Sequence, residues 1–279
     1  MSTSVLSPEM ESPCGFNFEN ARRNLHLKAS GFVPPKVTKT GTTICALIYR
    51  DGVVYGADTR STGGDMVADK AVHKIHQLAP NIIACGAGTS ADCDKVTQLI
   101  ASQLKLHRPE TGRQSRVATA DKLLTQRLFQ YQGYISAYLL VGGVDVDGPH
   151  LYSLGAHGNT SPKLFTATGS GMLGAMAELE TRYKENMAEE EAKELVKDAI
   201  LAGIFNDNGS GSDVNLAIVR KNDDFEIIEG YAKPNKKGER KNKYTYPKGT
   251  TAIISEVVKP IILDPNTQES TSQQQPMET

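Results

Sequence analysis

Short apolar runs separated by turn-forming residues dominate the sequence from residue 42 to about residue 228. The first two runs, residues 43–49 and 53–57, flank Arg50-Asp51-Gly52, and an Asp-Gly pair between apolar runs predicts a β-hairpin. A second pair of strands is expected around Pro80-Asn81. In all, strands are predicted at residues 43–49, 53–57, 74–78, 82–85, 135–144, 150–154, 163–168, 214–219 and 225–228.

Apolar residues recur with helical spacing in other segments. Two helices are indicated by the stripes Val96-Leu99-Ile100-Leu104 and Leu123-Leu124-Leu128-Tyr131. Two more are expected at residues 172–184 and 189–205, with Gly209 as a stop signal. Runs of strands and runs of helices favour an α+β fold with antiparallel sheets. Because the strands are apolar at nearly every position, two stacked sheets between helical layers are expected, in one large domain or two small ones.

The two ends of the chain differ from this pattern. Residues 1–38 are polar, contain several prolines and show no sustained period, which predicts an extended leader. Beyond residue 232, a cationic run at residues 236–243 precedes β-prone segments at residues 251–258 and 261–263. These segments predict either an arm that reaches a partner or an extra edge strand on the same domain.

Composition narrows the class of protein. The chain has 279 residues, 39% of them hydrophobic, and a formal net charge of −1, so global binding to nucleic acid or to an anionic membrane is not expected. No membrane span or signal peptide is indicated, which favours a reducing, intracellular compartment. The cysteines lack metal-ligand spacing and are interpreted as core thiols: Cys14, Cys45, Cys85 and Cys93.

Candidate chemistry begins at the Gly41-Thr42 bond, directly before the first apolar strand. Cleavage there would free a threonine that carries both a nucleophilic hydroxyl and an α-amine, whose ordinary pKa of roughly 7.7 to 8.0 suits a general base. The dipeptide alone is common and favours an ordinary strand start. Its interpretation therefore depends on the residues that accompany it.

Further candidates occur where predicted strands begin or end. Asp58 ends the second strand, and Lys74 begins the next one, where an inward-facing lysine would need Asp58 as its partner. Gly86 and Gly88 lie between a strand and a helix, where small residues let a substrate backbone approach. Two small polar junctions next to helices complete the set, at residues 169–171 and 206–212.

Together these segments resemble the active β subunits of the 20S proteasome, and within that family the beta-2 type. The resemblance covers the chain from about Thr40 through the tail. It rests on Thr-Gly-Thr-Thr (40–43), Gly-Ala-Asp-Thr-Arg (56–60), Lys-Ile (74–75), Cys-Gly-Ala-Gly-Thr (85–89), Gly-Ser-Gly (169–171) and Asn-Asp-x-Gly-Ser-Gly-Ser (206–212). The beta-2 type is indicated by residues 15–20, 131–134 and 234–238.

This resemblance implies an αββα sandwich of the N-terminal nucleophile hydrolase type and a threonine endopeptidase activated by self-cleavage between Gly41 and Thr42. Thr42 would be nucleophile and, through its freed amine, proton acceptor, while Asp58 and Lys74 tune the hydroxyl and the Gly88 N–H stabilises the oxyanion. The groups implied to hold the amine and a water are Ser170, Asp207 and Ser210.

The resemblance also implies trypsin-like cleavage after Lys or Arg, because Gly86 leaves the S1 pocket deep and Asp94 can meet a cationic P1 side chain. The alternative is that Asp94 only favours the helix N-terminus. Ser61, Val72 and Ser90 depart from the family's usual pocket residues, which leaves the fine P1 preference open.

The implied organisation is a propeptide (1–41), a protease domain (42–231) and a C-terminal extension (232–279) that packs on an adjacent β subunit. Partners would be the other β subunits of a heptameric ring, the α-ring subunits and polypeptide substrates, in ATP- and ubiquitin-dependent degradation in cytoplasm and nucleus. No metal or organic cofactor is expected, since the threonine and nearby charges suffice. The alternatives are a non-catalytic β subunit and another amidohydrolase of the same fold class.

Overall fold

The computed structural model describes residues 18–32, 40–221, 224–236, 238, 247, 249–250, 252 and 255–260. The chain divides into two compact units, Met1–Lys236 and Lys237–Thr279. Every described helix and strand belongs to the first unit. None of the helices in the described part of the chain combines the length and hydropathy of a membrane span.

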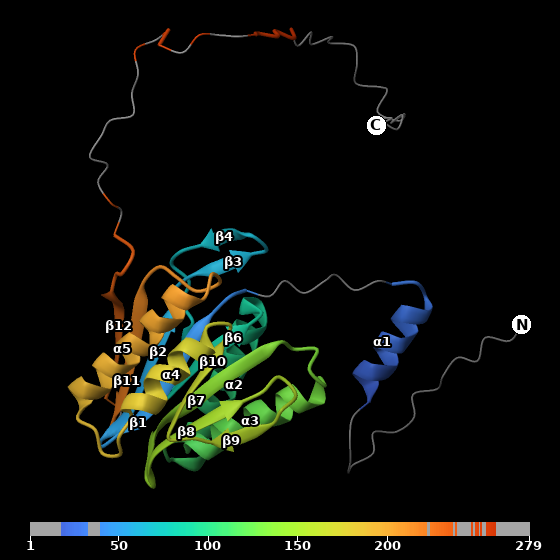
Figure 1. Cartoon of the computed structure of the whole chain (residues 1–279). Helices are drawn as coiled ribbons and strands as arrows, with labels where there is room; N and C mark the ends of the chain where they lie inside the picture. The colour runs from blue at the N-terminus through green and yellow to red at the C-terminus, as the bar shows by residue number, and fades with distance from the viewer. Residues whose placement is uncertain are drawn as a thin grey trace, which may run out of the picture. The chain divides into compact units, whose positions relative to one another are not determined.

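Two five-stranded antiparallel sheets form the centre of the first unit (Figure 1). In spatial order, the first sheet contains β10 (Phe165–Gly169), β1 (Thr43–Tyr49), β2 (Gly52–Asp58), β11 (Val214–Arg220) and β12 (Phe225–Ala232). The second sheet contains β5 (Ile75–Ala79), β6 (Ile82–Gly88), β7 (Ala137–Asp145), β8 (Gly148–Leu154) and β9 (Thr160–Pro162). A small separate hairpin is formed by β3 (Ser61–Gly63) and β4 (Met66–Asp69).

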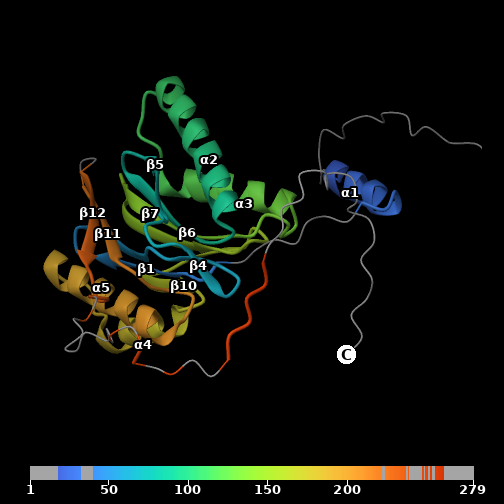
Figure 2. The same ribbon diagram turned by 90° about the horizontal axis from the view of Figure 1, so that it is seen from above.

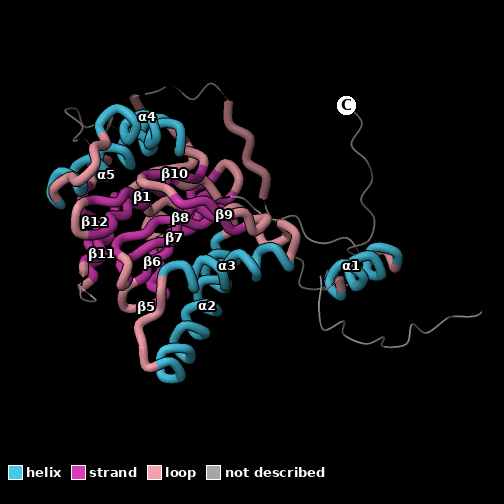
Figure 3. The backbone as a smooth tube through the Cα atoms, turned by 90° about the horizontal axis from the view of Figure 1, so that it is seen from below, coloured by secondary structure: helices cyan, strands magenta, loops and turns pink. Residues whose placement is uncertain are grey.

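Helices cover the outer face of each sheet. Figures 2 and 3 show α2 (Ser90–Thr111) and α3 (Val117–Gln130) on one side of the stacked sheets, and α4 (Met172–Arg182) and α5 (Glu189–Asn206) on the other. The order of layers is therefore helix, sheet, sheet, helix. This confirms the α+β sandwich that the apolar runs predicted.

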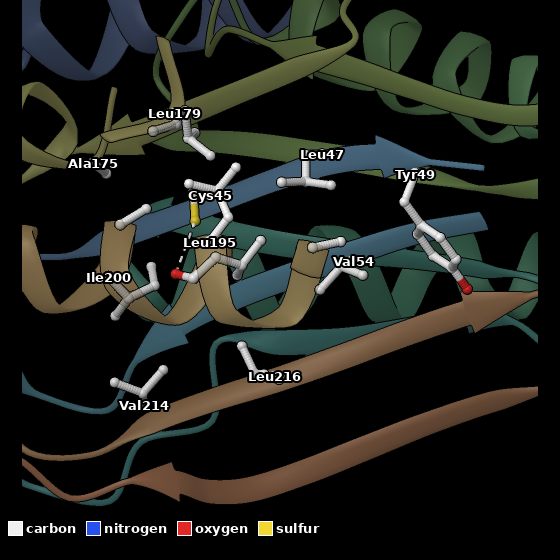
Figure 4. Close-up of a cluster of buried hydrophobic side chains, with 14 of the residues drawn as sticks. Cys45, Leu47, Tyr49, Val54, Ala175, Leu179, Leu195, Ile200, Val214 and Leu216 are labelled. Atoms are coloured by element: carbon white, nitrogen blue, oxygen red, sulfur yellow. Dashed lines mark hydrogen bonds between the residues drawn. The ribbon is translucent and has the colours of Figure 1, made fainter. Parts of the chain in front are cut away.

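The position of β1 between two buried layers explains why its sequence is apolar at nearly every position. Ile44 and Ala46 face the second sheet and join the cluster between the two sheets. Cys45, Leu47 and Tyr49 face the opposite way and pack with α4 and α5 (Figure 4). Because alternate side chains of a strand point to opposite faces, a strand buried on both faces needs an apolar residue at every position.

The main strands and helices lie within a few residues of their predicted bounds, but some predictions need correction. The prediction of an extended leader is wrong for Glu19–Ala29. These residues form helix α1, which has no buried residue. Its charges favour the helix, because Glu19 lies in the first turn and Lys28 in the last. The extra edge strand offered as one alternative for residues 251–258 is absent from its described part, residues 252 and 255–258, which have no strand structure. The prediction at residues 261–263 lies outside the described residues.

Candidate active site

One end of the sandwich collects the ends of strands from both sheets. In the first sheet, Thr43 of β1 pairs with Gly169 of β10, and Asp58 of β2 pairs with Val214 of β11. In the second sheet, the carbonyl of Lys74, directly before β5, accepts a hydrogen bond from the amide of Gly86. The predicted site residues are therefore brought together by strand register, although they are far apart in sequence.

Thr42 lies at the start of β1 and is 2% exposed. Its hydroxyl donates to the Gly41 carbonyl at 2.7 Å, and its amide donates to Ser170 Oγ at 3.0 Å. Gly169 has a φ of +100°, and a Cβ at this position would lie 2.1 Å from the Thr42 carbonyl oxygen. Only glycine permits this close approach of the two strands.

Asp58 and Lys74 form a buried ion pair, with Lys74 Nζ 2.7 Å from Asp58 Oδ1. Their side chains are 0% and 7% exposed. Burial lowers the pKa of Lys74 below its ordinary value, although the neighbouring Asp58 carboxylate opposes this shift. The carboxylate of Asp58 also accepts hydrogen bonds from the backbone amides of Thr43, Arg60 and Gly211.

The carbonyl oxygen of Gly41 is shared by two donors. Besides the Thr42 hydroxyl, Lys74 Nζ donates to it at 3.4 Å. A cation beside a carbonyl oxygen draws electron density from the carbonyl carbon, which makes that carbon a better electrophile. A hydroxyl, a cation and the carbonyl of the Gly41-Thr42 bond thus share one small volume.

Three hydroxyl groups and the Asp207 carboxylate form a hydrogen-bonded network. Ser170 Oγ and Ser210 Oγ donate to Asp207 Oδ2 at 2.6 and 2.7 Å, and Thr43 Oγ1 lies 2.7 Å from Ser210 Oγ. Partial burial acts to raise the pKa of Asp207, but the hydrogen bonds from Ser170, Ser210 and the Gly209 amide outweigh it and lower the pKa. Asp207 is therefore an anion that orients Ser170 toward the Thr42 nitrogen.

A pocket opens beside Thr42. Gly86 forms part of its wall, and a Cβ there would lie 2.9 Å from Cys93 Cβ, so a larger residue would narrow the pocket. Asp94 also lines it, with a side chain that is 45% exposed. The full lining is Thr40, Thr42, Ser61, Val72, His73, Lys74, His76, Gly86, Gly88, Ser90, Cys93 and Asp94.

Some contacts were not predicted from the sequence. Residues 40 and 41 are anchored at the site: the Thr40 hydroxyl donates to the Gly88 carbonyl at 3.0 Å, and the Thr62 hydroxyl accepts from the Gly41 amide at 3.0 Å. His76 lines the pocket, and its sequence signal is the alternation of strand residues, which puts it on the same face as Lys74. The role of Thr62 depends on how the β3–β4 hairpin folds, for which the sequence gives no comparable signal.

Two stacked antiparallel sheets between helix layers, with a threonine at the start of a central strand, constitute the N-terminal nucleophile hydrolase type of sandwich. Comparison with known proteins places the chain within this class. Residues 38–219 match the family described as "Proteasome subunit", and residues 234–267 match "Proteasome beta subunits C terminal". The chain belongs to the proteasome β-subunit family.

Relatives in several organisms resemble nearly the whole chain. "Probable proteasome subunit beta type-2" of Schizosaccharomyces pombe is 49% identical over 87% of this chain and 90% of its own length. "Proteasome subunit beta type-2" of Saccharomyces cerevisiae is 47% identical over 88% and 94%. "Proteasome subunit beta type-10" of Bos taurus is 45% identical over 95% and 96%.

Proposed function

We propose that this chain is a catalytic subunit of the 20S proteasome, a threonine endopeptidase whose nucleophile is Thr42. The observation that carries the proposal is the shared acceptor at the Gly41 carbonyl, to which both the Thr42 hydroxyl and Lys74 donate. A non-catalytic β subunit would have no need for this arrangement. Residues 1–41 are then a propeptide, residues 42–231 the protease domain and residues 232–279 an extension onto a neighbouring subunit.

Self-cleavage would begin with addition of Thr42 Oγ to the Gly41 carbonyl carbon. The carbon–nitrogen bond then breaks, the nitrogen takes up a proton, and Gly41 is left as an ester on the threonine oxygen. Water hydrolyses this ester, which releases the leader as a carboxylate and restores the Thr42 hydroxyl. The product carries a free α-amine that the uncut chain lacks.

In the processed enzyme the free amine would accept the proton from the Thr42 hydroxyl. Ser170 already contacts this nitrogen, and Asp207 and Ser210 form the network behind Ser170. The positive charge of Lys74 would favour loss of the hydroxyl proton, and the Gly88 N–H would stabilise the oxyanion. Nucleophile, proton acceptor and oxyanion donor are thus all supplied by residues of this chain.

The pocket supports a preference for Lys or Arg at P1. Gly86 leaves the pocket open, and the Asp94 carboxylate on its wall offers a charge-assisted contact to a cationic side chain. The names of the relatives support assembly with other proteasome subunits, which we propose to be the β subunits of the same ring and the α-ring subunits.

Replacement of the nucleophile tests the proposal in assembled particles. Thr42→Ala should prevent cleavage after Gly41 and reduce hydrolysis of an Arg-P1 fluorogenic peptide by this subunit at least about a thousandfold. N-terminal sequencing should find Thr42 first in the native subunit and leader residues in the variant. Thr181→Ala, an exposed threonine on α4, is the matched control and should be processed normally. Active native particles whose subunit begins at Met1 would refute the proposal.

A further inference from the structure

His76 lies in the proposed substrate pocket without a role in the reaction described above. It is the second residue of β5 and lies two residues after Lys74, and both residues line the pocket with Thr42. The His76 side chain is 19% exposed. A titratable ring therefore forms part of the wall that a substrate side chain would contact.

The ring of His76 faces Asp94, with Nε2 3.7 Å from Asp94 Oδ1. This distance is too long for a strong hydrogen bond but short enough for a strong charge interaction when the ring is protonated. Asp94 is the carboxylate to which we assign recognition of a cationic P1 side chain. The same carboxylate therefore has two possible cationic partners, one in the protein and one in the substrate.

The other charged or titratable groups around His76 come from the preceding residues of the chain and from α2. Lys74 and His73 precede it in the chain, and α2 contributes Cys93 beside Asp94, while its partner on β6 is the neutral Ala84. Burial lowers the pKa of His76; Asp94 opposes this shift and His73 adds to it. The ring is consequently uncharged at neutral pH and gains its proton only in acid, below its ordinary range near 6.5.

We propose that His76 is a specificity-determining residue, which leaves the Asp94 carboxylate free for a cationic P1 side chain when neutral and competes for it when protonated. This inference rests on the proposed protease function. It predicts that selectivity for Arg over an uncharged P1 residue declines as the pH falls. By thermodynamic linkage, a bound P1 cation must in turn disfavour protonation of His76 by the same factor.

Titration of the Thr42 amine would also change activity with pH, but it acts on every substrate alike. The informative quantity is therefore the ratio of kcat/KM for two peptides that differ only at P1, Arg in one and Gln in the other. Particles with Thr42→Ala provide the background to subtract for other subunits. The ratio is measured from pH 8 to pH 5.5.

In the native particle the Arg/Gln ratio should fall roughly threefold to fivefold toward pH 5.5, the size expected for a partly exposed charge pair. His76→Asn should remove most of this pH dependence. Asp94→Asn should lower the ratio at pH 8 and make it insensitive to pH. His157→Asn is the matched control and should retain the native slope, since His157 is exposed and does not line the pocket.

A constant ratio in the native particle, or an unchanged slope in His76→Asn, would overturn the inference while Thr42-dependent cleavage of both peptides continued. Loss of the slope in His157→Asn as well would also overturn it, because the effect would then not be specific to His76. Absence of any Thr42-dependent cleavage would instead refute the proposed function, and the inference with it. The two failures are thus distinguished by the Gln-P1 peptide.

Discussion

At the scale of single residues, Asp58 has the most demanding environment in the site. Its side chain is 0% exposed and accepts from Lys74 Nζ and three backbone amides. A buried charge is tolerated only when its partners replace the lost water, and removal of one partner leaves the other charge uncompensated. Asp58 and Lys74 are therefore interdependent in stability as well as in the proposed chemistry.

Asp58→Asn should destabilise the chain strongly, because Lys74 remains buried without its carboxylate. The expected loss is about 3 to 5 kcal/mol in the free energy of unfolding. Urea denaturation of the isolated full chain, followed by circular dichroism, measures this loss. The variant should also fail to cleave the Gly41-Thr42 bond in assembled particles.

An exposed ion pair provides the comparison. Arg116 and Asp147 are 59% and 57% exposed and lie 3.0 Å apart. Arg116→Gln should cost less than about 1 kcal/mol, because water already solvates both charges. Equal losses of unfolding free energy in Asp58→Asn and Arg116→Gln would show that burial does not determine how much the Asp58–Lys74 pair contributes to stability.

The sequence predicted those site residues that occupy the ends of apolar strands. Thr42, Asp58 and Lys74 are recognisable because each adjoins a strand, and the fold brings them together. His76 was missed although strand alternation from Lys74 would have placed it on the same face. Thr62 could not be found in this way, since its contact with Gly41 depends on how the β3–β4 hairpin folds.

At the scale of elements, Glu189 joins the start of α5 to the ends of β11 and β1. Arg220 donates to both of its carboxylate oxygens, at 2.8 and 2.6 Å, and the Tyr49 hydroxyl donates at 3.1 Å. The hydrogen bonds from Arg220, with help from Lys193, lower the pKa of Glu189 from 4.5 to about 2 despite partial burial. The acid also lies in the first turn of α5, where the helix dipole favours negative charge.

This depressed pKa makes the contribution of Glu189 dependent on pH. Because the native pKa is below the unfolded value, the stabilisation is complete above pH 4.5 and disappears as the pH falls through about 2. Glu189→Gln should therefore lower the free energy of unfolding by about 1 to 2 kcal/mol at pH 7, a range reduced to account for the partial exposure of the side chain. The loss should be much smaller at pH 2. Urea midpoints at the two pH values measure the difference.

The neighbouring Glu190→Gln is the control for this effect. Its carboxylate binds Lys193 but is 80% exposed, so its loss should change stability by less than about 0.5 kcal/mol at either pH. If Glu189→Gln lost the same stability at pH 2 as at pH 7, the ionised carboxylate would not be the cause.

Burial also explains which elements the sequence could predict. The main strands and helices contribute to the three buried clusters, so their apolar residues recur with a regular period. Strand β4 is exposed at all four positions and α1 has no buried residue. Elements held by local hydrogen bonds rather than by packing leave no apolar pattern, and these were the ones missed.

At the scale of the whole molecule, we propose that stability and assembly depend on different parts of the chain. The buried hydrophobic residues run from Ile44 to Val219. The described residues beyond position 236 are all exposed, including Val257 at 80% and Val258 at 77%. Exposed apolar residues in a β-prone segment suit contact with a partner, as the proposed C-terminal arm requires.

Deletion of residues 237–279 should separate these two properties. The unfolding free energy of the isolated chain should change by less than about 0.5 kcal/mol, since no described core residue is removed. Incorporation into particles, measured by native mass, should nevertheless fail. Deletion of residues 268–279 is the matched control, because it leaves the family match at residues 234–267 intact, and it should assemble normally. If the longer deletion assembled as well as the control, the tail would not hold a neighbouring subunit, and assembly would depend on surfaces of the sandwich itself.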